Sequence, residues 1–190
     1  MNQNLQNVVM KTYKDVIKKL KGYEQIIVSG PQRTGTTYFS QVLAKELFHK
    51  SRIDEGRFRI RNENEFMALL ESKNVVIQAP AMTHLLHRIP KIKSLMIIFM
   101  HRSQEDLNES EDRIGWHPHE FEIEKSQYLA EGFNVEKFSR NSAMKYSIWE
   151  NQKNSIKNDF IEVEYNVLKD TPGFVPKASR KNFGKKQTIL

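Results

Sequence analysis

An apolar run, a glycine-bracketed loop and an amphipathic segment follow one another in residues 25–44, QIIVSGPQRTGTTYFSQVLA, and few folds accommodate that order. Residues 26–28 predict a buried parallel strand. Thr36 or Thr37 is a favourable N-cap for the helix that follows. The first amide groups of a helix have no partner within it and lie at the positive end of its dipole, so they face whatever fills the loop. The stretch therefore predicts a binding site for a phosphate or sulfate group.

The loop has the spacing Gly30-x4-Gly35 followed by Thr36-Thr37, close to the phosphate-binding loop of nucleoside triphosphatases, which ends in Gly-Lys-Ser/Thr. Thr36 stands where that loop has its lysine, so the positive charge that reaches the outer phosphates of a triphosphate is missing. The cation of this loop is Arg33 instead. Because short motifs also occur by chance, a glycine-rich turn without a ligand is the alternative interpretation.

Residues 31–37, PQRTGTT, resemble the phosphosulfate-binding loop of sulfotransferases, Pro-x-Arg/Lys-Ser/Thr-Gly-Thr-Thr. In that family the loop holds the cofactor 3'-phosphoadenosine 5'-phosphosulfate (PAPS). Tyr38 follows where cytosolic members carry a tryptophan against the adenine, although a core aromatic residue would explain it equally well. The resemblance implies that the cofactor is bound by Gly30, Arg33, Thr34, Gly35, Thr36, Thr37 and Tyr38.

The length of 190 residues suits a single domain. We expect one sulfotransferase-like domain over residues 1–190, with a covering helix in residues 1–22 and a basic tail in residues 170–190. The chain has no cysteine, which excludes a disulfide framework and a thiolate zinc site and favours a reducing compartment, the cytoplasm. Its amino terminus lacks the apolar core of a signal peptide. The longest apolar run, residues 95–100, is far shorter than the about 20 residues of a membrane-spanning helix.

The formal net charge of +7 comes largely from lysines on the predicted first helix and from lysines and arginines in residues 177–190. A basic surface attracts phosphate backbones, but no nucleic-acid recognition motif accompanies the charge. We therefore expect a solvated surface, with binding of a small anionic ligand as the alternative for the tail, and no nucleic-acid partner.

Apolar and amphipathic segments alternate along the rest of the chain. Strands are predicted at residues 57–61, 75–77, 95–100 and 160–163, helices at 3–22, 63–70, 82–87, 103–113 and 135–157, and a loop at 115–121. This alternation predicts a three-layer α/β/α domain with a mainly parallel central sheet, of the P-loop nucleotide-binding type. Such sheets bind their ligands beyond the carboxyl ends of the strands.

A second motif follows the apolar strand at residues 95–100. Arg102 ends this strand, so it should lie at the same sheet edge as the loop, and Ser110 comes eight residues later on a predicted helix. An arginine and a serine at this spacing bind the 3'-phosphate of PAPS in sulfotransferases, and residues 97–110 are similar to that motif, except that Ser103-Gln104 stand where the family often has Asp/Asn-Pro. Arginine supplies a forked, permanently charged set of donors for phosphate.

Two weaker matches extend the resemblance towards the carboxyl terminus. Residues 160–168, FIEVEYNVL, are similar to the strand and turn that close the core of the family. Residues 179–184, SRKNFG, resemble the family's Arg-Lys-Gly loop, with Asn182 in place of its first glycine. This second match implies that Arg180 and Lys181 contact the 3'-phosphate.

The chemistry implied by the resemblance is transfer of a sulfuryl group in line from the cofactor to an acceptor. Arg33 matches the cation that stabilises the charge developing on the leaving oxygen, and no metal is expected. The histidine that serves as base in cytosolic members is missing, because residues 78–80 read Gln-Ala-Pro. Glu63 and Glu65, after the second strand, and His84 are the candidates for the base. A structural role is the alternative for each of them. Acidic residues such as the two glutamates are typical of a helix amino terminus, and His84 could be a packed or a solvated side chain.

These features predict a PAPS-dependent sulfotransferase that acts on a hydroxyl or an amine of a small-molecule or carbohydrate acceptor. A P-loop nucleotide kinase or nucleotide hydrolase with a displaced cation is the first alternative. A non-catalytic nucleotide-binding protein is the second. The acceptor itself does not follow from the motifs, because substrate loops vary independently of the core in this architecture.

Overall fold

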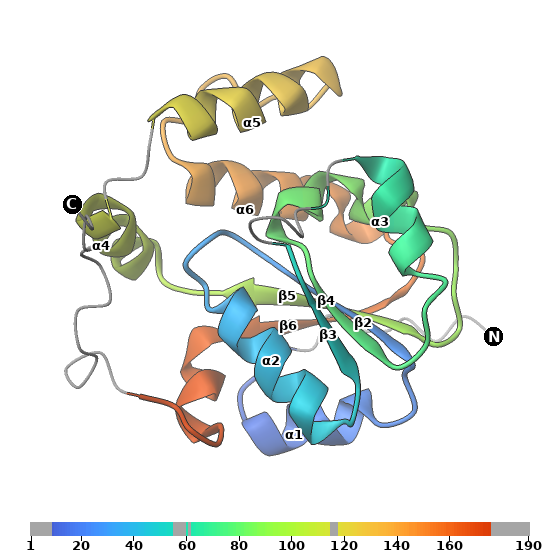
Figure 1. The fold of residues 1–190 in the computed structure, drawn as a ribbon. Coiled ribbons are helices and arrows are strands. Elements are labelled where there is room, and N and C mark those ends of the chain that lie inside the picture. Colours follow the sequence, from blue (N-terminus) through green and yellow to red (C-terminus); the bar gives the residue numbers. More distant parts are fainter. Residues whose placement is uncertain (1–8, 55–59, 61, 115–117, 176–190) are drawn as a thin grey trace, which may run out of the picture.

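The computed structural model describes residues 9–54, 60, 62–114 and 118–175. Its centre is a six-stranded sheet in which every pair of neighbouring strands is parallel, in the order β1-β6-β5-β2-β4-β3 (Figure 1). The strands are β1 (Val9–Met10), β2 (Gln25–Ser29), β3 (Lys50–Ile53), β4 (Val75–Gln78), β5 (Leu95–His101) and β6 (Asp159–Glu164). The parallel sheet with helices on both faces confirms the predicted three-layer α/β/α fold of P-loop type.

Helices connect successive strands and cover both faces of the sheet (Figure 1). The α-helices are α1 (Tyr13–Leu20), α2 (Thr36–Glu46), α3 (Glu63–Leu69), α4 (Gln104–Ile114), α5 (Pro118–Ala130) and α6 (Asn141–Gln152), and the 3-10 helices are η2 (Pro80–Arg88), η3 (Lys153–Ser155) and η4 (Tyr165–Asp170). Helices α1 and α2 pack on one face, and α3, η2 and α6 on the other. Helix α5 packs on the outer side of α6.

The apolar strands are buried on both faces because a parallel sheet carries helices on each side. Side chains alternate between the faces along a strand, so Ile26 and Val28 of β2 enter the core beneath α1 and α2 while Ile27 enters the other core. Strands β2 and β5 lie at the centre of the sheet, as the continuous apolar run at residues 95–100 predicted.

The first helix and one edge of the sheet differ from the prediction. The first helix begins at Tyr13, where Thr12 caps it by accepting a hydrogen bond from the Asp15 amide, and residues 9–10 form an edge strand paired with β6. The strand predicted at residues 57–61 lies, apart from Ile60, outside the described residues. The strand that borders β4 at the sheet edge is instead β3, because residues 50–53 pair in register with residues 75–78.

The other differences lie after α4. Helix α6 is shorter than the prediction for residues 135–157, since it begins after Arg140 and ends at Gln152. Residues 118–121, predicted to be part of a loop, belong to α5. Proline is well suited to the first position of a helix, because its fixed φ matches the helix and its missing N–H would have no partner there. Pro118 is thus the first residue of a helix and not a loop residue.

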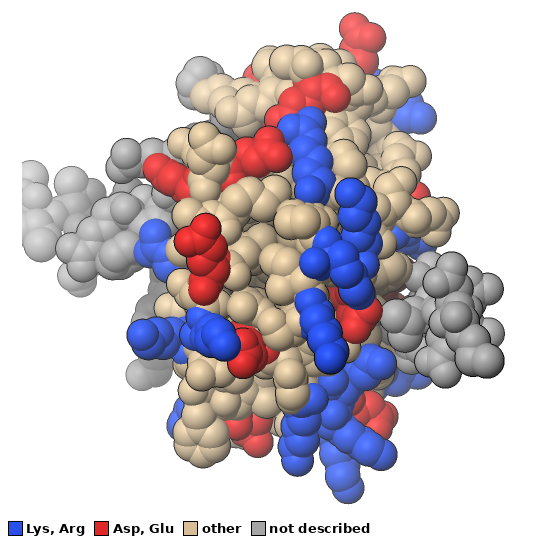
Figure 2. Space-filling model, turned by 90° about the vertical axis from the view of Figure 1, so that its right-hand side faces the viewer, with Lys and Arg blue, Asp and Glu red and all other residues tan. Residues whose placement is uncertain are grey.

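One face of the molecule is rich in positively charged side chains (Figure 2). Figure 2 shows a band of lysine and arginine side chains on the face where β2 and β5 begin. Among the described helices, none is long and apolar enough to cross a membrane.

Candidate functional site

The loop between β2 and α2 lies at the carboxyl edge of the sheet, beside the end of β5. Residues 25–29 pair in parallel with residues 95–99, so the two strands end side by side and their following loops meet. A cleft of about 620 Å³ opens there. The predicted cofactor-binding residues that line it are Arg33, Gly35, Thr36, Thr37, Tyr38, Arg102 and Ser110.

Three backbone positions with positive φ shape the loop, namely Gly30 (134°), Arg33 (72°) and Gly35 (85°). Gly35 is the N-cap of α2, so the prediction of Thr36 or Thr37 as the cap is wrong. Glycine is favoured at this turn because the left-handed conformation is strained for other residues. The loop also has an internal tie, because the Thr34 hydroxyl donates to the Pro31 carbonyl at 2.7 Å.

Gly30 and Thr34 support the loop and do not line the cleft. A Cβ at Gly30 would lie 2.7 Å from the Met100 carbonyl oxygen, so glycine allows the loop to pass close to β5. Thr34 is fully buried. A Cβ at Gly35 would lie 2.5 Å from Leu168 Cδ1, so this glycine serves packing as well as the cleft.

The two predicted phosphate motifs meet across the cleft. Arg33 Nε donates to Ser110 Oγ at 3.1 Å, and Arg102 Nη1 donates to the Arg33 carbonyl at 3.0 Å. The backbone of Arg102 is held by the Tyr146 hydroxyl, which accepts from its N–H and donates to its carbonyl, both at 2.8 Å. Its guanidinium lies over the Tyr165 ring, 4.3 Å from the centroid. These contacts hold the arginine of the second motif against the loop of the first.

Positive charge dominates the described lining of the cleft. Four cationic side chains, Arg33, Arg102, Arg113 and Lys169, contribute to it, against the single carboxylate of Asp106. Asp106 lies 3.7 Å from Arg102 Nε. The excess of positive charge suits a ligand with more than one phosphate or sulfate group.

Tyr38 stands at the rim of the cleft beside the last described residues. Its hydroxyl shares a hydrogen bond with the Thr171 hydroxyl at 2.8 Å and donates to the Pro172 carbonyl at 3.2 Å. Its ring meets Phe174 edge to face, with centroids 6.3 Å apart. The pair forms an aromatic wall that could contact a nucleobase.

Sequence reasoning missed several lining residues of the cleft, which are Asp106, Arg113, Tyr165, Asn166, Lys169 and Phe174. The sequence did contain a signal for Asp106 and Arg113. On a helix, residues three and four apart share a face, so Asp106, Ser110 and Arg113 lie in one row along α4. The other four come from η4 and the segment after it, and only the tertiary structure brings this part of the chain to the loop.

The residues predicted as candidates for the base do not line the cleft. Glu63 pairs with Arg88 at 3.1 Å, and the Glu65 amide donates at 2.9 Å to Oδ1 of Asn62, the N-cap of α3. His84 is buried, with Nε2 3.1 Å from Glu131 Oε1. Glu63 and His84 belong to one charged cluster around η2, joined through Arg88 and Glu131.

Burial makes His84 a weak base. Loss of solvent and the nearby charge of Lys145 lower the pKa of His84 to about 4. Its ring packs against Tyr128, with centroids 4.8 Å apart. At neutral pH the imidazole is therefore uncharged.

The remaining predictions about ligand contacts concern the basic tail and metal ions. Arg180 and Lys181, expected at the 3'-phosphate, lie outside the described residues. Within the described ranges, no group of three or more acidic or histidine side chains is placed to hold a metal ion.

Comparison with known proteins gives little information about function. No family model and no curated protein matches the sequence. Among solved structures, the chain is similar to shikimate kinase from Acinetobacter baumannii in complex with shikimate, with 10% sequence identity and a TM-score of 0.39, over 76% of this chain and 86% of that one. A likeness this distant carries no argument about activity. The fold class rests on the strand order and the loop themselves.

Proposed function

We propose that the cleft binds PAPS and that the protein transfers its sulfuryl group to a hydroxyl or an amine. The observation that carries the proposal is the contact between Arg33 and Ser110, because it joins two phosphate motifs that are 77 positions apart in sequence. Arginine and serine side chains donate hydrogen bonds to phosphate, and the charged donors bind most strongly. An anion between these side chains would accept from both.

The cofactor would lie along the cleft with its two anionic ends at the two motifs. The 5'-phosphosulfate would sit on the first amides of α2, at Thr36 and Thr37, where the helix dipole favours negative charge. The 3'-phosphate would lie between Arg102 and Ser110, and the adenine near Tyr38 and Phe174. This arrangement uses the cationic lining and the aromatic wall of the same cleft.

Arg33 would assist the transfer step. Negative charge accumulates on the bridging oxygen as the sulfuryl group leaves, and a fixed cation beside that oxygen lowers the barrier. The pKa of an arginine side chain is above about 12, so its contribution is electrostatic and not proton donation.

The test of the proposal is the response to the desulfated cofactor, 3'-phosphoadenosine 5'-phosphate (PAP), compared with ADP. PAP should raise the melting temperature more than ADP, because only PAP carries the 3'-phosphate that Arg102 and Ser110 would bind. Arg102→Ala should weaken PAP binding by about 2 to 3 kcal/mol and remove the preference. Thermal-shift titrations and calorimetry measure both. As a control, Arg88→Ala removes the same side chain outside the cleft and should retain the preference. Equal stabilisation of the wild type by PAP and ADP would contradict the proposal.

A second measurement separates transfer from binding. Arg33→Ala should lower the rate of PAPS turnover by about 10²-fold or more while PAP affinity falls much less, because the side chain acts mainly on charge that develops in the transition state. Arg33→Lys should recover part of the rate. PAP release is followed by ion-exchange chromatography, with water as the acceptor. Normal turnover in a folded Arg33→Ala protein would remove Arg33 from this role.

A P-loop kinase or nucleotide hydrolase is the second candidate. The observation that favours it is the parallel sheet with a Gly-x4-Gly loop between β2 and α2, which P-loop kinases share. Stronger stabilisation by ATP with magnesium than by PAP would select this candidate. Binding of PAP without turnover of PAPS would select the non-catalytic alternative.

A further inference from the structure

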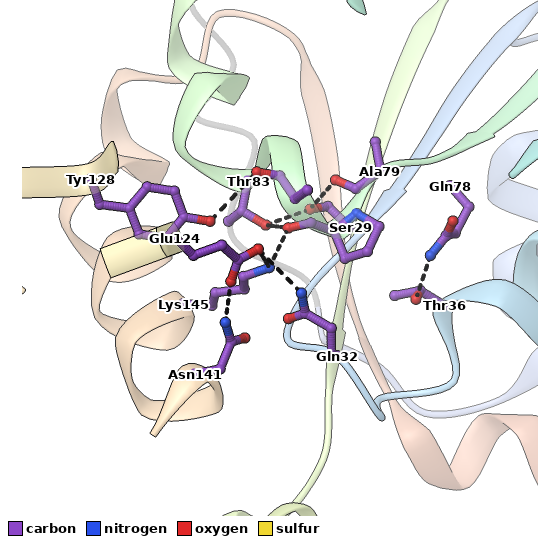
Figure 3. Close-up of polar contacts among 12 residues, drawn as sticks. Ser29, Gln32, Thr36, Gln78, Ala79, Thr83, Glu124, Tyr128, Asn141 and Lys145 are labelled. Atoms are coloured by element: carbon purple, nitrogen blue, oxygen red, sulfur yellow. Dashed lines mark hydrogen bonds and ion pairs between the residues drawn. The ribbon is translucent and has the colours of Figure 1, made fainter. Parts of the chain in front are cut away.

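A second polar cluster lies against the loop, formed by residues that do not line the cofactor cleft. It contains Gln32, the neighbour of Arg33, together with Glu124 of α5 and Asn141 and Lys145 of α6 (Figure 3). Gln32 Nε2 donates to Glu124 Oε1 at 3.3 Å, and Lys145 Nζ donates to the same oxygen at 3.1 Å. Asn141 Nδ2 donates to the other carboxylate oxygen. The loop is thus joined to two helices that sequence analysis did not connect with the site.

The charges in this cluster are buried. Lys145 is 0% exposed and Glu124 8%. Burying an ion pair removes both groups from water, and the attraction between them often fails to offset that loss. A hydrophobic pair would fill the same space, so the buried charges need a reason beyond stability. Buried ionisable groups beside a ligand-binding loop are typical of functional sites.

Two acceptor oxygens of the cluster are buried without a hydrogen-bond partner among the described residues. They are Gln32 Oε1 and Asn141 Oδ1, and Asn141 is 2% exposed. Buried polar atoms in folded proteins are almost always paired, so two unpaired acceptors next to a carboxylate call for an explanation, and a role in ligand binding is one. The O–H or N–H of an acceptor molecule is a suitable donor for them.

A groove leads from the surface to Asn141. It has a volume of about 870 Å³ and is lined by residues of α4, α5, α6 and the segment before α6, among them Phe121, Phe138 and Asn141. Phe121 is buried, whereas the half-buried Phe138 offers a surface on which the ring of a sugar or a phenol can pack, beside Lys137, whose amino group lies 5.3 Å from the ring centroid. The groove lining is distinct from that of the cofactor cleft, although α4 contributes to both.

We propose that this groove is the acceptor site and that Glu124 is the proton acceptor of the reaction. A hydroxyl or an amine of a ring compound enters along the groove and donates towards Gln32 Oε1 or Asn141 Oδ1, beside the Glu124 carboxylate. Its oxygen or nitrogen forms a bond to sulfur while the bond from sulfur to the bridging oxygen breaks, and the proton passes to Glu124. The products are the sulfated acceptor and PAP.

This inference rests on the proposed sulfotransferase function and supplies the base that the sequence did not identify. Like Glu63, Glu65 and His84, Glu124 does not line the cofactor cleft, but it accepts a hydrogen bond from Gln32, the residue next to Arg33. The positive charge of Lys145 compensates the negative charge of the buried Glu124 carboxylate.

The experiment compares wild type, Glu124→Gln and Glu105→Gln, using water as the acceptor and PAP release from PAPS as the signal. Glu124→Gln keeps the shape of the side chain and should bind PAP within about twofold of wild type, yet lose about 10²-fold in turnover, a typical contribution of a general base. Glu105→Gln removes the same charge from an exposed position on α4 and should match wild type in both. Calorimetry measures the affinity of each variant for PAP independently of turnover.

The pH profile distinguishes a base from a structural residue. His84, Tyr128 and Lys145 also face Glu124, from η2, α5 and α6. Wild-type turnover should fall on acidification, and in Glu124→Gln the residual turnover should lose that dependence, while the three neighbours remain. An acidic limb that persists in the variant would overturn the assignment.

If Glu124→Gln leaves Lys145 without its partner and fails to fold, the double variant Glu124→Gln/Lys145→Met removes both charges and is measured in its place. Wild-type turnover in a folded Glu124 variant would overturn this inference and leave the proposed function intact. Absence of PAP binding by the wild type would overturn the proposed function. PAP binding by a wild type that never turns over PAPS would overturn both.

Discussion

Lys145→Met is expected to lower the free energy of unfolding by about 3 to 5 kcal/mol, the cost of removing one member of a buried ion pair. Lys145 is 0% exposed, and its amino group donates to the Pro80 carbonyl at 2.9 Å as well as to Glu124. Methionine has a similar length, so the loss would come from the charge and the hydrogen bonds more than from packing. The Glu124 carboxylate would then be buried without a cation.

Urea unfolding at neutral pH measures this loss of stability, and two further variants serve as comparisons. Lys73→Met removes the exposed partner of Glu24, a pair that should contribute less than about 1 kcal/mol. Glu124→Gln/Lys145→Met should recover most of the loss, because no charge then remains unpaired. A loss for Lys145→Met as small as that for Lys73→Met would show that the buried pair is not needed for stability.

Gly30→Ala is expected to cost at least about 3 kcal/mol, because two separate penalties add. The φ of 134° is strained for any residue with a side chain, and the new Cβ would lie 2.7 Å from the Met100 carbonyl oxygen. That oxygen belongs to the backbone of β5, near the centre of the sheet, so it cannot move aside without disturbing strand pairing.

Gly22→Ala is the matched control for Gly30→Ala. Gly22 also has a positive φ, of 97°, but a Cβ there would meet nothing within 4 Å. Its cost should be confined to the backbone strain, about 1 to 2 kcal/mol. The difference between the two variants in urea unfolding isolates the contact with β5. Equal losses would mean that the close approach of loop and strand contributes nothing.

Much of the fold could be predicted because its determinants are local. The apolar runs at residues 26–28, 75–77, 95–100 and 160–163 all lie within strands of the parallel sheet. A run of apolar residues too short for a helix and bounded by turns leaves few alternatives to a buried strand. The amphipathic segment after Gly35 became α2 for the same reason.

Elements with weak local signals could not be predicted. Strand β1 has two residues, and its place at the sheet edge depends on pairing with β6, which is more than 150 positions away. Helix α5 begins within residues 115–121, a segment with one proline and two histidines, which is a pattern typical of loops. Its role comes from packing Phe121 and Tyr128 against α6.

The sequence predicted that Arg102 lies beside the loop of Arg33, because parallel strands bring their carboxyl ends to a common edge, and the resemblance to sulfotransferases added Ser110. That inference needs only two parallel strands and the residues that directly follow them, both of which are read from short stretches of the chain. The Arg33 to Ser110 hydrogen bond agrees with the placement of Ser110 in the same site.

The side chains that surround the loop could not be predicted in this way, because they come from segments far apart in the chain. Glu124 and Lys145 have no spacing or motif that relates them to Gln32, and their contact arises only when α5 and α6 pack over the carboxyl end of the sheet. The same packing buries His84 and lowers its pKa, which the order of residues does not predict. Anion-binding geometry is encoded locally in the backbone of a turn and a helix end, whereas burial, charge pairing and proton affinity depend on which distant side chains become neighbours.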